Sequence, residues 1–285
     1  MTFGCVLLTM GRRPEALRRA LDSLLMQQGV ELDVVVVGNE WEPAGLPGAV
    51  RGVGSAENLG IPAGRNLGVP HVRGELLFFL DDDASLASPD ALAAVARRFA
   101  EDPRLGLLQL RVEPLGGGPR ARDWVPRLRV GDPARSSDVT VVWEGAVAIR
   151  REVFEAVGGW PADFRFVHEG VDLGWRVMEA GFRVAYAGDI VALHPSPTGT
   201  PHGYSFYYGA RNRAWLARRH LPAALGALYL GGFALRTLPR LRSRQDAQRA
   251  LRGYRDGLRG PGGERRPLSA RTLWRMTRAG RPPIM

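Results

Sequence analysis

The chain has 285 residues, of which 45% are hydrophobic and 24% are charged, a composition that excludes a disordered or collagen-like protein and is typical of a large globular domain. Its single cysteine, Cys5, excludes an intrachain disulfide framework. The formal net charge is +10, and all 39 basic residues are arginines.

The positive charge is concentrated toward the C-terminal end. Residues 211–285 contain 18 arginines and three acidic residues, a net charge of +15, whereas residues 1–210 carry −5. Such a basic tail is typical of contact with an acidic membrane surface or a nucleic acid, or it simply favours solubility. Because arginine is used in place of lysine throughout, a single arginine is weak evidence for an anion site.

No segment has the pattern of a secretory signal or a membrane-spanning helix. The apolar start FGCVLL has no basic residue before it and is too short for a signal peptide. The longest uncharged stretch, 221–235, has 15 residues with three glycines and a proline, which is fewer than the roughly 20 residues that span a bilayer. We therefore expect a cytoplasmic protein.

Predicted strands and helices alternate over the first 105 residues. The β-branched run LDVVVVG indicates a strand that is buried on both faces. Pro14 suits the first turn of a helix with leucines at helical spacing, and Ser88 is the predicted N-cap of a later helix. The expected elements are strands at 2–9, 32–38 and 74–80 and helices at 14–27, near 62 and at 88–102. This order predicts a parallel, doubly wound α/β sheet.

The pattern is less regular after residue 105. Residues 114–138 are rich in Gly, Pro and Arg and predict a long functional loop. The other expected elements are strands at 105–114 and 182–189, a strand and a short helix within 139–160, and a helix at 169–181 ended by Gly181. From about residue 221 the chain is expected to be helical, and after residue 259 it is basic and broken by Gly and Pro.

Three carboxylates follow the predicted strand in LLFFLDDDA, residues 76–84. In an open α/β sheet, ligands bind outside the carboxyl ends of the strands. In an extended segment Asp81 and Asp83 share a face and Asp82 points elsewhere. Two carboxylates on one face suit Mg²⁺ or Mn²⁺, particularly with phosphate oxygens as further ligands. The alternative is an acidic loop that leads into the next helix.

The segment ENLGIPAGRNLG, residues 57–68, places Arg65 and Asn66 near a predicted helix start. An arginine there can pair with a diphosphate, and a helix N-terminus also favours anions. Taken alone, the segment is more simply a loop with a surface arginine.

Further ionisable residues lie in HEGVDLGWR and VALHPSP. Glu169 and Asp172 are three residues apart and therefore share a helix face, and Arg176 can pair with Asp172. His194 follows a short apolar strand. In isolation these are a solvated acid–base ladder and a structural histidine.

Taken together, these segments resemble the family 2 glycosyltransferases of the GT-A fold. The matching segments are LLTMGRR, VVVVGNE, ENLGIPAGRNLGV, FLDDDA, EGAVAIRREVFEAVGGW, HEGVDLGWR, VALHPSP and YYGARNRAWL, and they cover residues 3 to about 220. The resemblance implies a Rossmann-like mixed sheet flanked by helices. It also implies a catalytic domain at 1–220, with a nucleotide-binding half at 1–105 and an acceptor half at 106–220, and a basic helical appendage at 221–285.

The resemblance further implies an inverting transfer of a sugar from a nucleotide diphosphate to a hydroxyl group. Asp81, Asp83 and His194 would hold Mn²⁺ or Mg²⁺. Gly145 and the loop 158–160 would border the acceptor. The nucleotide and its diphosphate would contact Thr9, Arg12, Asn39, Asn58, Arg65, Asn66 and Asp82. In such a reaction the metal stabilises the leaving diphosphate, and a carboxylate takes the proton of the hydroxyl.

Two positions depart from the pattern of similar enzymes. Many of them carry an aspartate that contacts the nucleobase where this chain has Gly38, so a UDP or dTDP donor is expected from the resemblance rather than from that contact. Gly170 stands where the catalytic base is common and cannot accept a proton. We therefore expect Glu169 to be the base, followed by Asp172 and then by His168, unless Asp172 only orients Glu169.

The appendage at 221–285 joins an apolar segment to an arginine-rich one. That combination is able to lie in an anionic membrane interface and would suit a lipid-linked or cell-envelope acceptor at the inner face of the membrane. The alternative is an apolar helix packed on the catalytic domain, followed by a solvated basic tail.

Three other functions agree less well with the sequence. A nucleic-acid-binding protein is disfavoured because the positive charge avoids the body of the chain and no binding motif is present. A dehydrogenase or P-loop enzyme is excluded because the first strand is followed by TMGRRPEA and not by a glycine-rich phosphate motif. A non-catalytic nucleotide-sugar-binding protein is disfavoured by the retained acidic residues.

Overall fold

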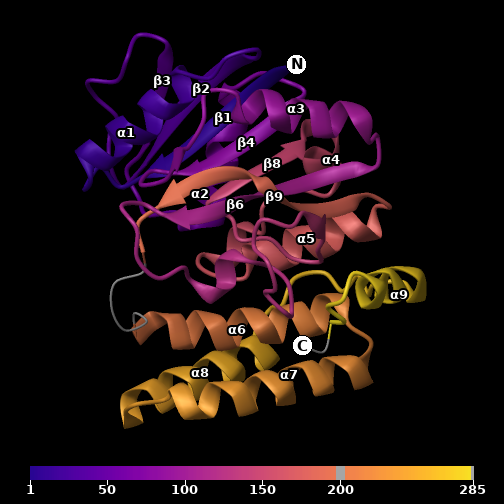
Figure 1. Ribbon diagram of the computed structural model, residues 1–285. Helices are drawn as coiled ribbons and strands as arrows, with labels where there is room; N and C mark the ends of the chain where they lie inside the picture. The colour runs from indigo at the N-terminus through magenta and orange to yellow at the C-terminus, as the bar shows by residue number, and fades with distance from the viewer. Residues whose placement is uncertain (197–202, 284–285) are drawn as a thin grey trace.

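A nine-stranded mixed sheet forms the centre of the computed structural model, which describes residues 1–196 and 203–283 (Figure 1). Its strands are β1 (Thr2–Thr9), β2 (Glu31–Asn39), β3 (Val50–Ser55), β4 (Leu76–Asp81), β5 (Ser85–Leu86), β6 (Leu105–Pro114), β7 (Ser137–Asp138), β8 (Ala146–Arg150) and β9 (Arg183–His194). They follow the order β3-β2-β1-β4-β8-β6-β9-β5, and β7 pairs with β9. The expected α/β class and mixed sheet are confirmed.

The sheet divides into a parallel half and a mixed half. Strands β3, β2, β1 and β4 are all parallel, as the alternation of the first 105 residues predicts. Strand β8 runs antiparallel to both of its neighbours, β4 and β6. Strand β3 was not expected, because VRGVGS contains two glycines and no continuous apolar run.

Helices cover both faces of the sheet. They are α1 (Pro14–Leu25), α2 (Ile61–Gly68), α3 (Ala91–Glu101), α4 (Arg151–Ala156), α5 (Glu169–Glu179), α6 (Gly203–His220), α7 (Ala223–Thr237), α8 (Arg244–Arg259) and α9 (Ala270–Arg278). Alternate residues of each central strand enter opposite cores: Phe78 packs with α1 and α3, and Phe79 packs with α4 and α5. This explains the continuous apolar runs, since both faces are buried.

The prediction that Ser88 caps α3 is wrong. The helix begins at Ala91 with Asp90 at the cap position, and the Ser88 hydroxyl donates to the Asp90 carboxylate. The chain is held extended before this point, because Ser85–Leu86 pairs with β9 and the amide of Ala87 donates to Val191. Gly181 does end α5, with a φ of 96° that suits glycine.

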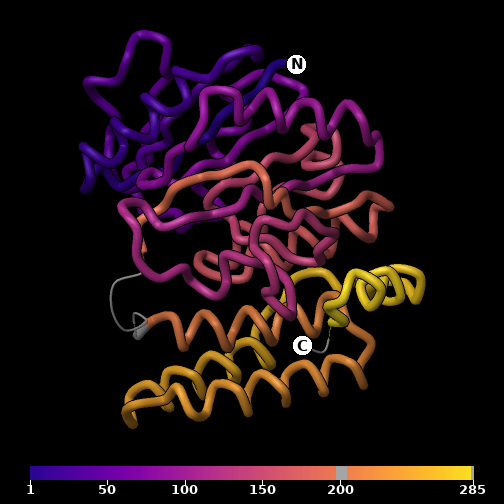
Figure 2. Tube along the Cα trace, viewed as in Figure 1, coloured from indigo at the N-terminus to yellow at the C-terminus, as the bar shows by residue number. Residues whose placement is uncertain are grey.

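The last helices form a layer beneath the sheet (Figures 1 and 2). Helix α6 packs against α7 and α8, so this helical layer begins before residue 221. A Cβ on Gly253 would lie 2.3 Å from the carbonyl oxygen of Tyr207, so glycine is what lets α8 approach α6 so closely. The core of the sheet continues into this layer through Trp215, Tyr229 and Met276. The appendage is therefore packed on the body, as one of the two alternatives predicted.

Candidate active site

Two cavities meet at the carboxyl-terminal edge of the parallel strands. We call the larger, of about 920 Å³, the strand-end cavity, and the other, of about 520 Å³, the helix-side cavity. Ile61, Arg65, Asp81 and Phe166 line both, so the cavities adjoin there. The polar residues that line only the strand-end cavity include Thr9, Arg12, Arg13, Asn39, Asn58, Asp82, Asp83 and His194.

Asp81, Asp83 and His194 form a group that suits a divalent cation. Each offers one ligand atom, and these atoms lie within 4.8 Å of one another. His194 Nε2 lies 3.1 Å from Asp83 Oδ1 and 3.9 Å from Asp81 Oδ2. Two carboxylates and an imidazole are a donor set that fits Mn²⁺ or Mg²⁺.

Asp82 points away from this group, as expected, although the reason differs from the one predicted. Its Oδ2 accepts a 2.6 Å hydrogen bond from the Thr9 hydroxyl. The backbone turns after Asp81, where the amide of Ala84 donates to the Asp81 carbonyl at 3.0 Å. A turn, and not an extended segment, therefore directs Asp81 and Asp83 to the same side.

The ionisation of the cluster follows from burial and from its neighbours. Burial raises the pKa of Asp82 to about 6. Burial also acts to raise the pKa of Asp83, but the hydrogen bond with His194 and the charge of Arg13 outweigh it and lower that pKa. Burial acts to lower the pKa of His194, but the interaction with Asp83 outweighs it and raises that pKa. Asp83 thus keeps the charge that a metal ligand needs.

The imidazole of His194 is held in the orientation that a metal ligand requires. Its Nδ1 lies 2.7 Å from the carbonyl of Pro195, which fixes the proton there and leaves Nε2 toward the carboxylates. Trp124 and Trp143 hold the ring edge-on, with centroids at 5.5 and 5.1 Å. The rest of the VALHPSP segment includes Pro197, which lies outside the described residues.

Arg13 is a site residue that the sequence analysis missed. Its guanidinium pairs with Asp82 Oδ1 at 2.5 Å and also with Asp83. The only signal was its place two residues past the glycine that follows β1, and in a chain whose only cation is arginine that signal is weak.

Arg65 connects the two cavities. It is 4% exposed and pairs with Asp81 Oδ1 at 2.6 Å, while its other nitrogen lies 4.0 Å from Glu169 Oε1. Its guanidinium carbon lies 5.2 Å from the ring centroid of the buried Trp160. Of the residues expected at the acceptor, Gly145 lines the helix-side cavity. Trp160 instead packs its ring against the guanidinium of Arg65.

The three asparagines expected at the nucleotide have different surroundings. Asn39 and Asn58 line the strand-end cavity and bond to each other at 3.2 Å. Asn66 lies away from it, because its side chain bonds to both the amide and the carbonyl of Trp160, at 3.0 and 2.8 Å. Asn66 therefore does not line the strand-end cavity, and its side chain holds the loop that contains Trp160.

Gly38 has no room for the aspartate that similar enzymes carry. A Cβ there would lie 1.9 Å from the carbonyl oxygen of Trp41. The segment after β2 folds back across the strand end and occupies that space.

Asp172 is a structural brace. It is 2% exposed, and its carboxylate bonds to Arg176 at 2.6 Å and to His220 Nε2 at 2.7 Å. Burial acts to raise its pKa, but these partners outweigh burial and lower it to about 2. The Asp172–Arg176 pair expected from the sequence is present. Asp172 lines neither cavity, which favours the alternative that it orients Glu169 over a role as the base.

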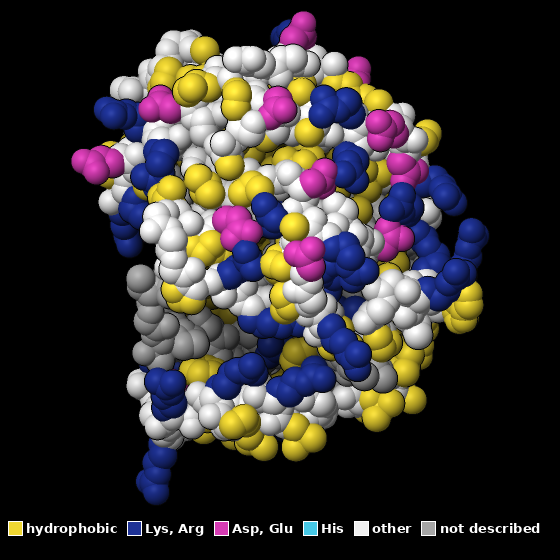
Figure 3. Space-filling model, in the orientation of Figure 1, with side chains coloured by type: hydrophobic (Ala, Val, Ile, Leu, Met, Phe, Trp, Pro, Cys, Tyr) yellow, Lys and Arg dark blue, Asp and Glu magenta, His cyan; other side chains and the backbone are white. Residues whose placement is uncertain are grey.

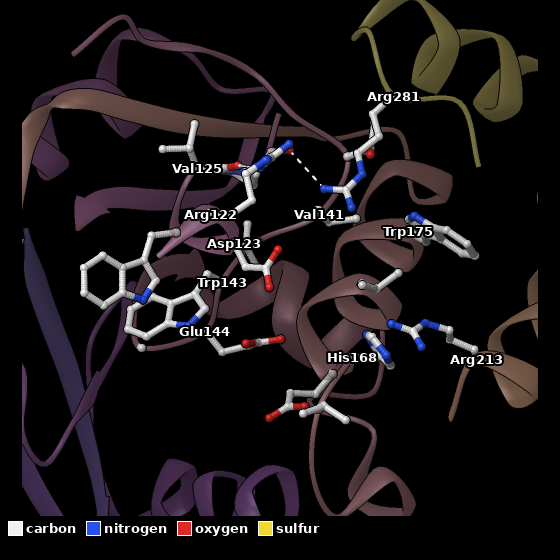
Figure 4. Close-up of a pocket in the computed structure, with 18 of the residues that line it drawn as sticks. Arg122, Asp123, Val125, Val141, Trp143, Glu144, His168, Trp175, Arg213 and Arg281 are labelled. Carbon is white, nitrogen blue, oxygen red and sulfur yellow. Dashed lines mark hydrogen bonds between the residues drawn. The ribbon is translucent and has the colours of Figure 1, made fainter. Parts of the chain in front are cut away.

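Glu169 and Glu144 are the two glutamates that line the helix-side cavity (Figure 4). Glu169 is 3% exposed at the start of α5, and its Oε2 has no hydrogen-bond partner. Glu144 was missed, since no spacing along the chain relates it to residue 169. Its Oε1 accepts a 2.6 Å hydrogen bond from the amide of Gly170. Burial, together with the charge of Glu169, raises the pKa of Glu144.

Comparisons with known proteins agree with this geometry. A family model described as Glycosyl transferase family group 2 matches residues 76–239. The O-antigen biosynthesis protein RfbC of Myxococcus xanthus is 26% identical over an alignment of 215 positions, and the match covers 64% of this chain. The chain spans 16% of that much longer protein.

Solved structures share the fold at low identity. The mannosyltransferase PcManGT from Pyrobaculum calidifontis, in complex with GDP-Man and Mn²⁺, is 19% identical with a TM-score of 0.57, and the match covers 97% of this chain and 72% of the other. GalNAc-T7 with UDP, GalNAc and Mn²⁺ is 14% identical with a TM-score of 0.64, and the match covers 91% and 56%.

Replacing Asp172 should test the brace. Asp172→Asn leaves Arg176 and His220 without their anion in a buried site, so we expect a loss of stability on the order of 3 kcal/mol at pH 7. A depressed carboxyl pKa stabilises the fold above the ordinary aspartate pKa. The stability difference between parent and variant should therefore shrink as the pH falls through about 4 toward 2.

Urea denaturation at pH 7, 4 and 3 measures this difference. Asp22→Asn, which loses only an exposed pair with Arg18, is the matched control and should change stability by less than about 0.5 kcal/mol. An Asp172→Asn variant as stable as the parent at pH 7 would contradict the brace.

Proposed function

The chain belongs to the glycosyl transferase family group 2, and from this membership we propose that it transfers a sugar from a nucleotide diphosphate donor to a hydroxyl acceptor with inversion. One observation carries the proposal: the Asp81–Asp83–His194 group lies where the strand-end cavity adjoins a second cavity lined by Glu144 and Glu169. This arrangement offers one compartment for a donor and another for an acceptor.

The donor would occupy the strand-end cavity. Thr9, Arg12, Asn39 and Asn58 line it and supply polar contacts for a nucleotide. A divalent cation held by Asp81, Asp83 and His194 would stabilise the negative charge on the departing diphosphate. The nucleotides bound in the two solved structures contain different bases, guanine and uracil, and therefore do not decide the base that this chain would bind. We propose a UDP or dTDP donor from the resemblance described in the sequence analysis.

The acceptor would occupy the helix-side cavity. Its hydroxyl is a poor nucleophile, so a carboxylate on that side must take its proton. Glu144 and Glu169 are placed to do so, on the far side of Asp81 from the strand-end cavity. A base on the face opposite the leaving group is the arrangement of a single displacement, which inverts the sugar carbon.

We also propose that α7 contacts an anionic membrane surface, which would suit a lipid-linked acceptor. Leu228 and Leu235 on this mainly apolar helix are 60% and 70% exposed, and Leu238 just beyond it is 59% exposed. Figure 3 shows apolar side chains along the edge of the helical layer and arginines gathered above them. In the part of the chain that the structure describes, no helix is both long and apolar enough to cross a bilayer.

The donor proposal is tested with a panel of UDP-, dTDP- and GDP-sugars. Calorimetric titration with and without Mn²⁺ should find one metal-dependent donor. Asp83→Asn should weaken its binding at least tenfold, because an anionic ligand is lost. Asp22→Asn is again the control and should bind normally. Unchanged metal-dependent binding by Asp83→Asn, or no binding of any sugar nucleotide by the parent, would refute the proposal.

The membrane proposal is tested by sedimentation with lipid vesicles. The protein should bind phosphatidylglycerol vesicles and not phosphatidylcholine vesicles, because the arginines near α7 attract anionic lipid. Leu228→Glu with Leu235→Glu should weaken binding, since both remove apolar contact area. Met26→Glu, an exposed change next to α1 (67% exposed), should have no effect. Equal binding by both variants would count against α7 as the contact.

A further inference from the structure

Three arginines from separate parts of the chain converge on the end of the helix-side cavity (Figure 4). Arg122 comes from the loop after β6, Arg213 from α6, and Arg281 from the segment after α9. We call this group the arginine subsite. Within residues 1–196 and 203–283, no carboxylate lies within ion-pair distance of any of the three. The exposed Asp123 lines the same cavity, and its charge favours the charged forms of Arg213 and Arg281 from further away.

None of these guanidinium groups has a carboxylate as a direct hydrogen-bond partner among the described residues, and Arg122 is exposed. Arg122 donates to backbone carbonyls of its own loop, such as that of Val125 at 2.9 Å, and Arg281 donates to the carbonyl of Pro126 at 3.3 Å. The Nε of Arg213 is buried without any partner, although its guanidinium stacks 4.3 Å over Phe233.

Burial makes the positive charges of Arg213 and Arg281 costly in free energy. It lowers the pKa of Arg213 and of Arg281. His168 lies against the same group, and its pKa is lowered well below the ordinary value, first by burial and then by those two arginines. Buried cations without anionic partners destabilise the free protein, and a bound anion would relieve the repulsion.

We propose that the arginine subsite binds a phosphate or diphosphate group carried by the acceptor, an inference that rests on the proposed transferase function. Several guanidinium groups match the charge and oxygen geometry of a diphosphate better than those of a single carboxylate. The apolar side chains of Trp175, Tyr229, Phe233 and Met276 line the same cavity, which suits an acceptor that joins a phosphate to a hydrocarbon chain.

The test is titration of the full chain with inorganic pyrophosphate in EDTA, which removes metal-dependent binding at the strand-end cavity. Arg213→Gln and Arg281→Gln should each weaken pyrophosphate binding at least tenfold. Arg252→Gln removes the same charge from an exposed position on α8 and should bind like the parent. Thermal unfolding of each variant checks that it is folded.

The outcomes separate this subsite from the donor site. Pyrophosphate binding that is equal in parent, Arg213→Gln and Arg281→Gln, or absent from the parent, would overturn the subsite even if metal-dependent sugar-nucleotide binding is normal. Farnesyl diphosphate identifies the source of the phosphate. Binding tighter than that of pyrophosphate, and lost in Arg213→Gln, assigns a lipid-linked acceptor, whereas equal affinity assigns a soluble sugar phosphate.

A separate observation concerns the space above Gly170. A Cβ on Gly170 would lie 2.5 Å from Glu144 Oε1 and 2.3 Å from the carbonyl oxygen of Val142. The Glu144 carboxylate therefore occupies the volume that a side chain at position 170 would fill, at the first turn of α5. The absence of a side chain at Gly170 leaves room for the Glu144 carboxylate.

We infer that Glu144 is the base of the proposed transfer. Its bond with Gly170 uses Oε1, whereas Glu169 lies toward Arg65. The acceptor oxygen would bond to the sugar carbon as the bond from that carbon to the diphosphate breaks. The bonding electrons would leave with the diphosphate, and the hydroxyl proton would pass to the Glu144 carboxylate. Burial and the charge of Glu169 raise the pKa of Glu144, so its carboxylate, once ionised, accepts that proton more strongly than an ordinary glutamate.

Single-turnover rates with the donor identified above test this assignment. Glu144→Gln keeps an Oε1 acceptor for Gly170, so it should fold and bind donor normally while transfer slows at least 100-fold. Glu169→Gln should slow transfer less. Formate should restore part of the activity of Glu144→Ala, which a purely structural role would not permit. Near-parental transfer by Glu144→Gln with normal donor binding would overturn Glu144 as the base, and loss of donor binding in the parent would instead refute the transferase proposal.

Discussion

The charge balance around Arg65 is the interaction on which the candidate site depends. Its guanidinium is almost wholly buried, pairs with Asp81 at the end of β4, and faces Glu169 at the start of α5. Without that positive charge the two carboxylates would repel each other across a poorly hydrated space. One side chain thus joins the metal-binding side of the site to the side where a proton would be taken, and this is why the two cavities meet.

The helical layer lines the helix-side cavity as well as extending the core. Its apolar residues extend the core of the sheet, and Arg213 and Arg281 close one end of the cavity that Glu144 enters. Part of the positive charge of the C-terminal region therefore lines an internal cavity, while other arginines lie on the surface (Figure 3).

The sequence allowed the long strands, the acidic cluster and the strand-end position of His194 to be predicted, because each is marked by a local pattern: an apolar run, adjacent carboxylates, or a strand end. The glycine-containing β3 and the two-residue strands β5 and β7 lack such a pattern. Glu144 and Arg13 have no such mark, since their importance comes from what they face in space. Asn66 has the right position in the chain but points to Trp160. Ser88 has a capping residue's composition, yet strand pairing at Ser85–Leu86 delays the helix. Tertiary contacts decided each of these cases.

Arg13 has a consequence for how the site is filled. Its guanidinium already pairs with both Asp82 and Asp83. An incoming metal ion must compete with this resident counter-ion, and a lone ion brings no partner for the arginine it displaces. A metal that arrives with a diphosphate does, because the released guanidinium gains phosphate oxygens nearby. If the proposed donor site is correct, we expect cation and nucleotide to bind together.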